Sequence, residues 1–189
     1  MDILLVGQDY GNPGSERNYK TIKSIVDIQH GEDIPYFSGS RTDKTLEELF
    51  EIFDCKISSK EPGKRLFFTN YSLGYREKTE TGGMTKSLLL KDKELFDDLV
   101  AAIKPKIIIC LGKITYEAVS GEKAKGFVSK LREGKPFKSL YHLKLQNGTS
   151  YKIPVYGVAH CGARGLSNVG GIEKMEDAWK CIAEEYNRM

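Results

Sequence analysis

The sequence predicts an α/β fold: a three-layer α/β/α sandwich whose central sheet is mainly parallel and has four strands. Three observations lead to this expectation. Four short apolar runs are spread along the chain, amphipathic helical patterns lie between them, and no linker, repeat or low-complexity tract divides the 189 residues. A chain of this length can bury a core without disulfides or metal ions to hold it together. We therefore expect one domain over residues 1–189.

The four predicted strands are continuous apolar runs that each stop at a polar residue or a glycine. Buried parallel strands have this pattern, whereas strands with one face in water alternate between apolar and polar residues. The runs are Ile3 to Val6, Leu66 to Phe68, Ile107 to Leu111 and Val155 to Ala159. Before the last run, Asn147-Gly148 stands between apolar segments and predicts a type I′ hairpin, a small antiparallel excursion ahead of the final strand.

Four helices are predicted from apolar residues that recur every three or four positions. Strands that alternate with helices favour right-handed crossovers, which place helices over both faces of a parallel sheet. Pro105 closes the third helix, and the spacing of Thr45 and Glu48 predicts a capping box in the second. The apolar positions are Tyr19, Ile22 and Val26; Leu46, Leu49, Phe50 and Phe53; Leu95, Leu99 and Ile103; and Met175, Trp179, Ile182 and Tyr186.

Composition excludes several classes of protein. Hydrophobic residues make up 40% of the chain and charged residues 29%, a balance that disordered proteins lack. The longest apolar run, Ile107 to Leu111, is far shorter than the roughly 20 residues of a membrane-spanning helix. The first residues also lack the basic and apolar regions of a signal peptide. We therefore expect a soluble, cytoplasmic protein with no membrane partner.

Cysteine spacing and charge narrow the chemistry further. No Cys-x-x-Cys pair typical of zinc sites, iron–sulfur clusters or redox dithiols is present, so we expect reduced thiols and neither metal nor cofactor. The formal net charge of +3 permits nucleic-acid binding without requiring it. Between Glu122 and Lys144, seven cations stand against two anions, which fits a solvated face and a phosphate-binding surface equally well. The cysteines are Cys55, Cys110, Cys161 and Cys181.

Chemically useful side chains follow the predicted strands at their carboxyl ends. Asp9 follows the first strand, Asn70 the second, Gly112-Lys113 the third and His160 the fourth. Ligands of open α/β sheets bind beyond these ends, so one crevice is expected to hold them all. A carboxylate there can activate water, a carboxamide can read a donor–acceptor edge, and an imidazole can stabilise negative charge. Spacing alone leaves open a turn role for Asp9 and Asn70 and a structural role for His160.

Two common nucleotide-binding motifs are absent from the sequence. No Gly-x-Gly-x-x-Gly follows a predicted strand, which excludes the dinucleotide fingerprint. Gly112-Lys113 is followed by Ile114 instead of Ser or Thr and has no Gly five residues before it, so it is not a P-loop. His160 and Cys161 are neighbours on an extended chain and point to opposite faces, which argues against a Cys–His catalytic pair.

The motifs at the strand ends, taken in order, resemble those of the uracil-DNA glycosylase superfamily. Gly7-Gln8-Asp9 and Asn12-Pro13-Gly14 resemble the water-activating motif of family 1 and the turn that follows it. Other segments are similar to motifs of families 4 and 5. Pro35 to Gly39 resembles their Pro-Phe-Val-Gly segment, and Phe68 to Asn70 resembles their Thr-Asn strand end. Lys104 to Lys113 resembles their helix–Pro–strand–Leu-Gly-Lys block, and Pro154 to His160 resembles the strand before their His-Pro motif.

The resemblance implies a DNA repair glycosylase that hydrolyses the N-glycosidic bond of a uracil flipped out of DNA, in the superfamily's α/β/α fold. It implies that Asp9 positions or activates water and that His160 stabilises the departing base. Phe37 would stack on the flipped ring, and Asn70 would pair with its edge. The implied substrate-binding residues are Gly7, Gln8, Tyr10, Phe37 and Asn70. The implied DNA-binding residues are Lys113, Arg164 and Leu166, with Leu166 or Arg164 filling the gap in the base stack.

The chain departs from the family at several positions, and three alternatives stay open. Tyr10-Gly11-Asn12 stands where family 1 has Pro-Tyr-His, and Cys161 to Arg164 replaces the Pro and Ser after the family's histidine. The cluster cysteines of family 4 have no counterpart, so no iron–sulfur cluster is implied. The alternatives are a superfamily member that binds nucleic acid or a nucleotide without base excision, an enzyme for another base such as hypoxanthine, xanthine or mismatched thymine, and a small-molecule enzyme on an unrelated scaffold. The expected partner is DNA that contains uracil or another damaged base, and the protein is expected to be a monomer.

Overall fold

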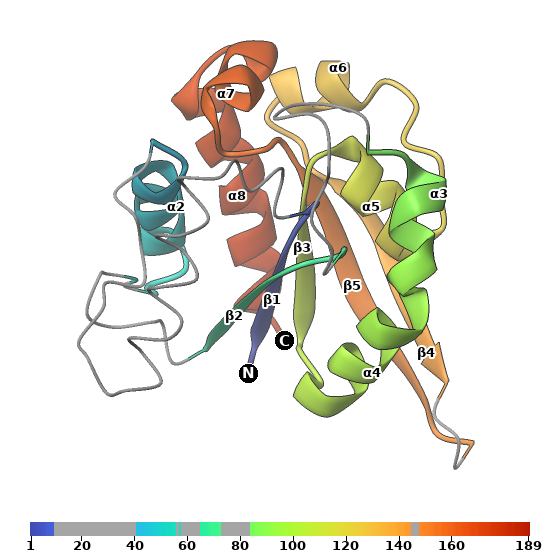
Figure 1. The fold of residues 1–189 in the computed structure, drawn as a ribbon. Helices are drawn as coiled ribbons and strands as arrows, with labels where there is room; N and C mark the ends of the chain where they lie inside the picture. Colours follow the sequence, from blue (N-terminus) through green and yellow to red (C-terminus); the bar gives the residue numbers. More distant parts are fainter. Residues whose placement is uncertain (10–40, 56, 58–64, 73–83, 145–147) are drawn as a thin grey trace, which may run out of the picture.

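A computed structural model of the protein describes residues 1–9, 41–55, 57, 65–72, 84–144 and 148–189. In the described part of the chain, five strands form one sheet in the order β2-β1-β3-β5-β4. Four of them are parallel, and β4 runs antiparallel to β5 at one edge (Figure 1). The strands are β1 (Ile3–Gly7), β2 (Leu66–Asn70), β3 (Ile107–Leu111), β4 (Phe137–Lys144) and β5 (Ser150–Val158). The predicted α/β class and mainly parallel sheet are therefore confirmed.

The number of strands is corrected from four to five. β4 and β5 form the predicted antiparallel pair, but β5 continues without a break into the last central strand, so the pair belongs to the main sheet. Side chains of β5 alternate between exposed and buried until Val155, where the strand also begins to pair with β3 and becomes buried on both faces. The apolar run in the sequence therefore predicted only the inner half of β5. The predicted turn residue Asn147 lies outside the described residues.

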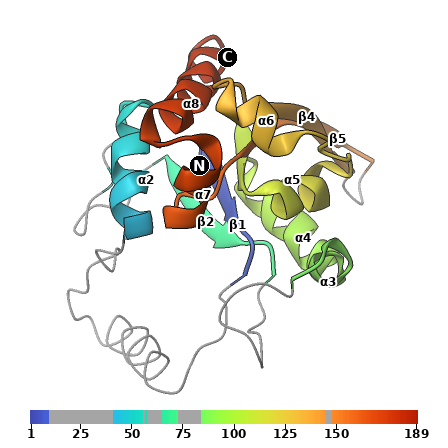
Figure 2. The same ribbon diagram turned by 90° about the horizontal axis from the view of Figure 1, so that it is seen from above.

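Helices cover both faces of the sheet. α2 and α8 lie on one face, α4 and α5 lie on the other, and α7 lies at the carboxyl end of the parallel strands (Figures 1 and 2). The predicted helix around Tyr19 lies outside the described residues. The helices are α2 (Arg41–Glu51), α3 (Lys86–Leu89), the short 3-10 helix η1 (Leu90–Asp92), α4 (Lys93–Ile103), α5 (Lys113–Ser120), α6 (Phe127–Arg132), α7 (Ala163–Val169) and α8 (Ile172–Tyr186).

The start of α2 differs from the prediction. The helix begins at Arg41, and the hydroxyl of Thr45 donates to the Arg41 carbonyl oxygen at 2.9 Å. Thr45 therefore lies inside the helix, where its hydroxyl bonds to the preceding turn, and the predicted capping box is wrong. The predicted apolar face is confirmed, because Leu46, Leu49 and Phe50 are all buried.

The buried face of α4 also differs from the prediction. Leu95 was expected in the core but is 55% exposed, while Phe96 and Val100 are buried. Phe96 stacks on Tyr71, with 4.6 Å between ring centroids, and packs edge-on against Tyr141 at 5.9 Å. Because buried aromatic rings contribute more contact area than a leucine, their packing turns the helix by about one position from the leucine face.

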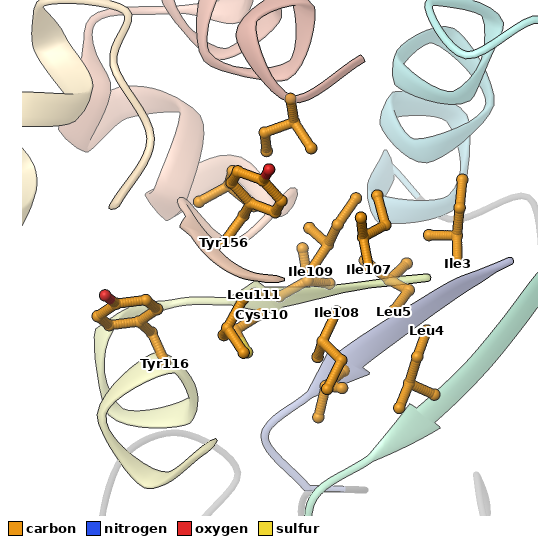
Figure 3. Close-up of a cluster of buried hydrophobic side chains, with 14 of the residues drawn as sticks. Ile3, Leu4, Leu5, Ile107, Ile108, Ile109, Cys110, Leu111, Tyr116 and Tyr156 are labelled. Atoms are coloured by element: carbon orange, nitrogen blue, oxygen red, sulfur yellow. The ribbon is translucent and has the colours of Figure 1, made fainter. Parts of the chain in front are cut away.

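The core has two halves, which the central strands fill with alternate side chains. Ile107 and Ile109 of β3 point to one side of the sheet and Ile108 points to the other (Figure 3). All three are fully buried, as expected of a central parallel strand. On the α8 face, Trp179 packs edge-on against Phe50 of α2, with 5.1 Å between their rings. The strands therefore hold their carboxyl ends on a rigid support.

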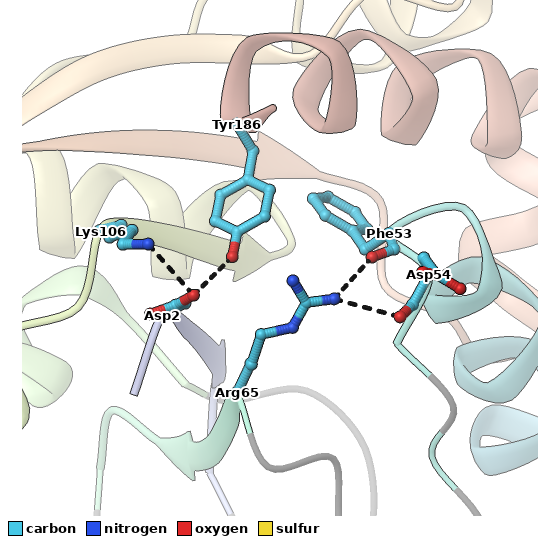
Figure 4. A network of polar contacts seen from close by, with 6 residues as sticks. All are labelled: Asp2, Phe53, Asp54, Arg65, Lys106 and Tyr186. Carbon is cyan, nitrogen blue, oxygen red and sulfur yellow. Dashed lines mark hydrogen bonds and ion pairs between the residues drawn. The ribbon is translucent and has the colours of Figure 1, made fainter. Parts of the chain in front are cut away.

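Polar contacts join both ends of the chain at the amino end of the sheet (Figure 4). Tyr186 donates its hydroxyl to Asp2 Oδ2 at 2.7 Å, and Lys106 Nζ lies 3.3 Å from the same oxygen. These hydrogen bonds, that of Tyr186 first, hold the pKa of Asp2 below its usual range. Arg65 Nη2 donates to the carbonyl oxygen of Phe53 at 3.1 Å. At this end, Asp2, Lys106 and Tyr186 thus contact one another, whereas Arg65 binds the backbone that follows α2.

Candidate functional site

The predicted site residues follow strands that end level with one another, at the edge that Figure 2 views from above. Gly7 at the end of β1 pairs with Asn70 at the end of β2. Leu111 at the end of β3 pairs with Val158 at the end of β5, and Val6 pairs with the residue before Leu111. The segments after these strands therefore start from one line across the sheet, as in other open α/β folds that bind ligands.

Gly7 provides the space that the Asn70 side chain occupies. A methyl group on Gly7 would lie 2.1 Å from Asn70 Oδ1, so the amide lies directly across the glycine. Asn70 itself is buried, with 7% of its surface exposed. Any larger residue at position 7 would displace the amide. This contact gives a physical reason for the first residue of the Gly7-Gln8-Asp9 motif.

The backbone stays paired beyond β1 and β2 as far as the residue before Asp9. Tyr71 N donates to the Gly7 carbonyl oxygen at 3.0 Å, and Ser72 N donates to the Gln8 carbonyl oxygen at 3.1 Å. These two bonds extend the ladder past the last strand residues. Asp9 is half-buried, and its Oδ2 atom is shielded from solvent. Its carboxylate therefore follows a fixed backbone at the edge that also holds Asn70.

His160 is held as a neutral ring whose proton is on Nε2. The backbone N–H of Gly162 donates to His160 Nδ1 at 3.0 Å, and a ring nitrogen that accepts a hydrogen bond carries no proton. Although the residue keeps an exposed surface, burial of the ring lowers the pKa of His160 below 6.5. At neutral pH the imidazole is therefore uncharged, and its Nε2–H can donate to a ligand oxygen.

Two glycines shape the segment after His160. A methyl group on Gly165 would lie 1.8 Å from the His160 carbonyl oxygen, so this carbonyl passes directly against α7. A methyl group on Gly162 would lie 3.1 Å from His160 Nδ1 and 3.4 Å from Thr42 Oγ1 of α2. Cys161, between His160 and Gly162, is fully buried, and burial raises the pKa of its thiol. Residues 161–165 therefore fold back onto His160, and the start of α2 lies beside this segment.

A pocket of about 450 Å³ opens beside His160, between α6 and the starts of α5 and α7. Lys113 and Arg164 contribute exposed cations to it. Lys113 Nζ lies 3.8 Å from Glu117 Oε1, and because the lysine is exposed and the distance is long, this pair holds it weakly. The pocket, called the His160 pocket below, is lined by Gly112, Lys113, Phe127, Val128, Leu131, Ala159, His160, Gly162, Ala163, Arg164, Gly165, Asn168 and Val169.

Asn70 lines a different hollow, of about 400 Å³, between β2 and α4. This hollow is mostly apolar, and burial raises the pKa of its Tyr71 hydroxyl to about 12, so the phenol is neutral at physiological pH. The described residues therefore place His160 and Asn70 at one edge but in two hollows, where sequence reasoning expected one crevice. The second hollow is lined by Phe67, Thr69, Asn70, Tyr71, Leu95, Phe96, Asp98 and Leu99.

Two of the predicted site residues, Tyr10 and Phe37, lie outside the described residues. Leu166, expected as an exposed wedge for DNA, is 9% exposed and belongs to the core. Leu166 and Val169 stand three apart on the buried side of α7, so the leucine points inward and that expectation is corrected. Arg164 is exposed, and its role in DNA binding stays a prediction.

Sequence reasoning did not single out three residues that help to form the site. Thr42 lies beside Gly162, Gly165 accommodates the His160 carbonyl, and Asn168 lines the His160 pocket. The glycines that follow His160 at short intervals were the one signal in the sequence, because close backbone approach is a common reason for glycine. Thr42 and Asn168 belong to no motif and are brought to the site by tertiary packing alone.

Several cations between Glu122 and Lys144 are engaged within the protein. Lys130 Nζ lies over the Phe137 ring, 4.6 Å from its centroid, and Lys138 pairs with Glu185. Arg132 Nε donates to a backbone carbonyl oxygen of α7 at 2.8 Å. These contacts favour a solvated, structurally engaged surface over a dedicated phosphate-binding surface for this segment.

Among the described residues, no group of three His, Cys, Asp or Glu side chains is placed to hold a metal ion. No helix in that part of the chain is long and apolar enough to cross a membrane. The four cysteines are free thiols. Full burial raises the pKa of Cys110 and of Cys161, so neither is a thiolate nucleophile at neutral pH.

Comparison with known proteins gives little guidance. No model of a known protein family matches the chain, and no curated protein matches it. Among solved structures, the chain is similar to a domain of unknown function (DUF1537) from Bordetella bronchiseptica, crystallised with bound citrate as a domain-swapped dimer. The match has a TM-score of 0.32 and 13% identity, and it covers 95% of this chain and 41% of that chain. Likeness at this level supports no conclusion about function.

Proposed function

We propose that the protein is a DNA repair glycosylase of the uracil-DNA glycosylase superfamily, which hydrolyses the N-glycosidic bond of a flipped-out uracil or a related deaminated base. One observation carries the proposal: Asp9, Asn70 and His160 lie at or just after the ends of three parallel strands that end level at one edge of the sheet. Their order along the chain is the order of the family's motifs. The mainly parallel α/β architecture is compatible with the superfamily's fold.

Asn70 would recognise the base. Its amide oxygen can accept from uracil N3–H while its amide nitrogen donates to O4, and cytosine presents the opposite pattern. Because Asn70 is buried, a base that fails to pair leaves a polar group without a partner, which costs about 1–3 kcal/mol. Discrimination against cytosine would follow from this penalty.

Asp9 and His160 would act on the charges that develop as the bond breaks. The base leaves with the bonding electrons, so positive charge grows on the sugar and negative charge grows on the base. A carboxylate at Asp9 favours the first, and the Nε2–H of His160 favours the second by donating to a base oxygen. Water then adds its oxygen to C1′ of the sugar and loses a proton, and the base anion is protonated by solvent.

A single-stranded oligonucleotide with one uracil tests the proposal. Incubation with the protein followed by alkali is expected to cleave the strand at that position. Asp9→Asn and His160→Ala are each expected to lower the excision rate by about a hundredfold, the usual loss for a positioned acid–base or charge-stabilising group. Ser167→Ala, at an exposed position of α7, serves as the matched control and should excise at the wild-type rate.

Folding of each variant is checked by circular dichroism before its activity is compared. A folded wild type that binds the oligonucleotide but leaves every uracil in place would contradict the proposal and favour a binding protein. Excision of hypoxanthine, xanthine or mismatched thymine from a parallel panel, with uracil left intact, would keep the reaction and change the base.

The pH dependence of excision reports on His160. Since burial lowers its pKa below 6.5, the ring stays neutral throughout the neutral range, and the rate should be flat there. At lower pH, protonation of Nδ1 breaks the hydrogen bond from Gly162, so the rate should fall as the pH drops through the lowered pKa. Single-turnover rates from about pH 8 to about pH 5 measure the profile. The matched variant His142→Gln, at an exposed histidine of β4, should reproduce it, whereas a rate that rises in acid would contradict the neutral role.

A further inference from the structure

We propose that the His160 pocket binds a nucleoside 5′-phosphate unit, with the phosphate between Lys113 and Arg164 and the base and sugar against α6. The unit would be a nucleotide next to the excised one in the same strand, and in this respect the inference rests on the proposed function. The pocket itself is argued from its size, its walls and its charges.

The size and walls of the pocket call for more than an inorganic anion. Its volume of about 450 Å³ falls within the range of small-molecule sites, about 300–1,000 Å³. Phe127, Val128 and Leu131 of α6 form an apolar wall, and Val128 is 38% exposed. A purely hydrophilic ligand would leave this wall without a partner, whereas a base and sugar would cover it.

The aromatic part of the wall is fixed in place. Phe127 stacks on Phe137 with 5.1 Å between ring centroids, and Tyr116 lies 6.4 Å from it on a third element. Tyr116 in turn packs against Gly157 of β5, where a methyl group would come within 2.7 Å of its ring. Phe127 is itself 6% exposed, so it anchors α6, and the exposed side chain of Val128 offers the preformed surface that a base would cover without ordering it first.

The polar side of the pocket suits a phosphate. Glu117 accepts from Ala124 N at 2.8 Å, so Lys113 can turn toward a ligand without leaving that carboxylate alone. Arg164 is exposed on α7 and can bind two phosphate oxygens at once. The neutral His160 ring adds no charge to the pair. Two cations are therefore enough for the single charge of a phosphodiester in a strand and also for the two charges of the monophosphate used as a probe.

The pocket is distinct from the place where the base would be recognised. Asn70 lines the hollow between β2 and α4, whereas this pocket lies beyond β5. Three strand spacings, about 14 Å, separate the ends of β2 and β5 in the sheet. A base that reaches both Asn70 and the Nε2–H of His160 would lie between the two hollows and would leave the space beyond His160 unfilled, so the His160 pocket takes a second nucleotide.

Isothermal titration with three probes tests the proposal: thymidine 5′-monophosphate, thymidine and inorganic phosphate. The monophosphate should bind more tightly than either part alone. Val128→Trp, which fills the pocket, and Lys113→Ala should each weaken its binding at least tenfold. Leu140→Trp adds the same ring at an apolar position of β4 that is 41% exposed, and it should bind like the wild type. Equal binding of the monophosphate and inorganic phosphate, or unchanged binding to Val128→Trp, would overturn the proposal.

A second arm identifies the source of the nucleotide. A dithymidylate without uracil that binds more tightly than the mononucleotide, and loses affinity in Val128→Trp, supports a nucleic-acid strand in the pocket. Equal affinity for the two supports a free nucleotide in the pocket and overturns the neighbour assignment. None of these measurements requires base excision. Failure of the proposed function would appear as intact uracil with nucleotide binding retained, so the two failures are distinguishable.

Discussion

Replacing Gly165 with alanine is expected to destabilise the protein by about 3 kcal/mol or more, at the upper end of the range for overpacking. Gly165 lies within α7, where alanine is ordinarily about 1 kcal/mol better than glycine. Here the added methyl group would lie 1.8 Å from the His160 carbonyl oxygen. That oxygen belongs to the backbone and cannot rotate away, so the sign of the substitution reverses. Urea unfolding of the two proteins measures the difference.

The matched control for this substitution is Ser167→Ala in the same helix. Ser167 is exposed, and its change to alanine should alter stability by no more than about 0.5 kcal/mol. Any remaining folded Gly165→Ala protein should also lose excision, since the substitution displaces the backbone of His160 itself. A Gly165→Ala protein as stable as the wild type would show that the segment from His160 to α7 does not approach as closely as described.

Gly7→Ala is expected to lower uracil excision by about a thousandfold, the upper range for loss of one positioned hydrogen-bonding group. Its methyl group would lie 2.1 Å from Asn70 Oδ1 and push the amide out of position. Because a side-chain end can rotate, the loss of stability should be small beside that of Gly165→Ala. Single-turnover excision and urea unfolding, measured on the same preparation, separate the two effects.

A double-mutant cycle with Asn70→Ala shows whether Gly7 acts through the amide. Asn70→Ala removes the group that the methyl would displace, so Gly7→Ala should have little further effect in that background. The double variant is then expected to excise at the rate of Asn70→Ala alone. Independent, multiplying losses would contradict the arrangement and indicate that Gly7 is needed for another reason.

The parallel part of the sheet could be predicted because a strand that is buried on both faces has an unbroken run of apolar residues in the sequence. Ile107 to Leu111 is an unbroken apolar run, and β3 has these same bounds. α8 was predicted for a related reason, since Met175, Trp179 and Ile182 form one apolar stripe and all are buried. In both elements the apolar residues are the ones buried in the core, so their spacing in the sequence predicts the element.

Elements with a mixed environment were harder to predict. β4 alternates between exposed and buried residues, so it carries no apolar run and was missed as a member of the main sheet. In α4, the choice between Leu95 and Phe96 depends on Tyr71 and Tyr141, which come from distant parts of the sequence. Leu166 was assigned to the surface by resemblance, whereas the spacing of α7 places it in the core.

The sequence predicts which strand ends form the candidate site, but it does not predict the shape of the hollows there. Parallel strands bring their carboxyl ends to one edge, so Asp9, Asn70 and His160 were expected there from order alone. The tautomer of His160 depends on a backbone hydrogen bond from Gly162, which no residue type predicts. The His160 pocket depends on a wall formed by α6, whose side chains belong to no motif.

The position of β1 in the sheet has a consequence for biosynthesis. β1 is made before both of its partners, since Ile3 pairs with Leu66 on one side and with Ile107 on the other. All five of its residues are buried in the finished protein. Such distant partners slow folding, and during translation an apolar strand with two open edges remains exposed until the ribosome has made β3. The strand that anchors the candidate site is therefore an apolar segment of the nascent chain that needs protection from aggregation until β3 has been made.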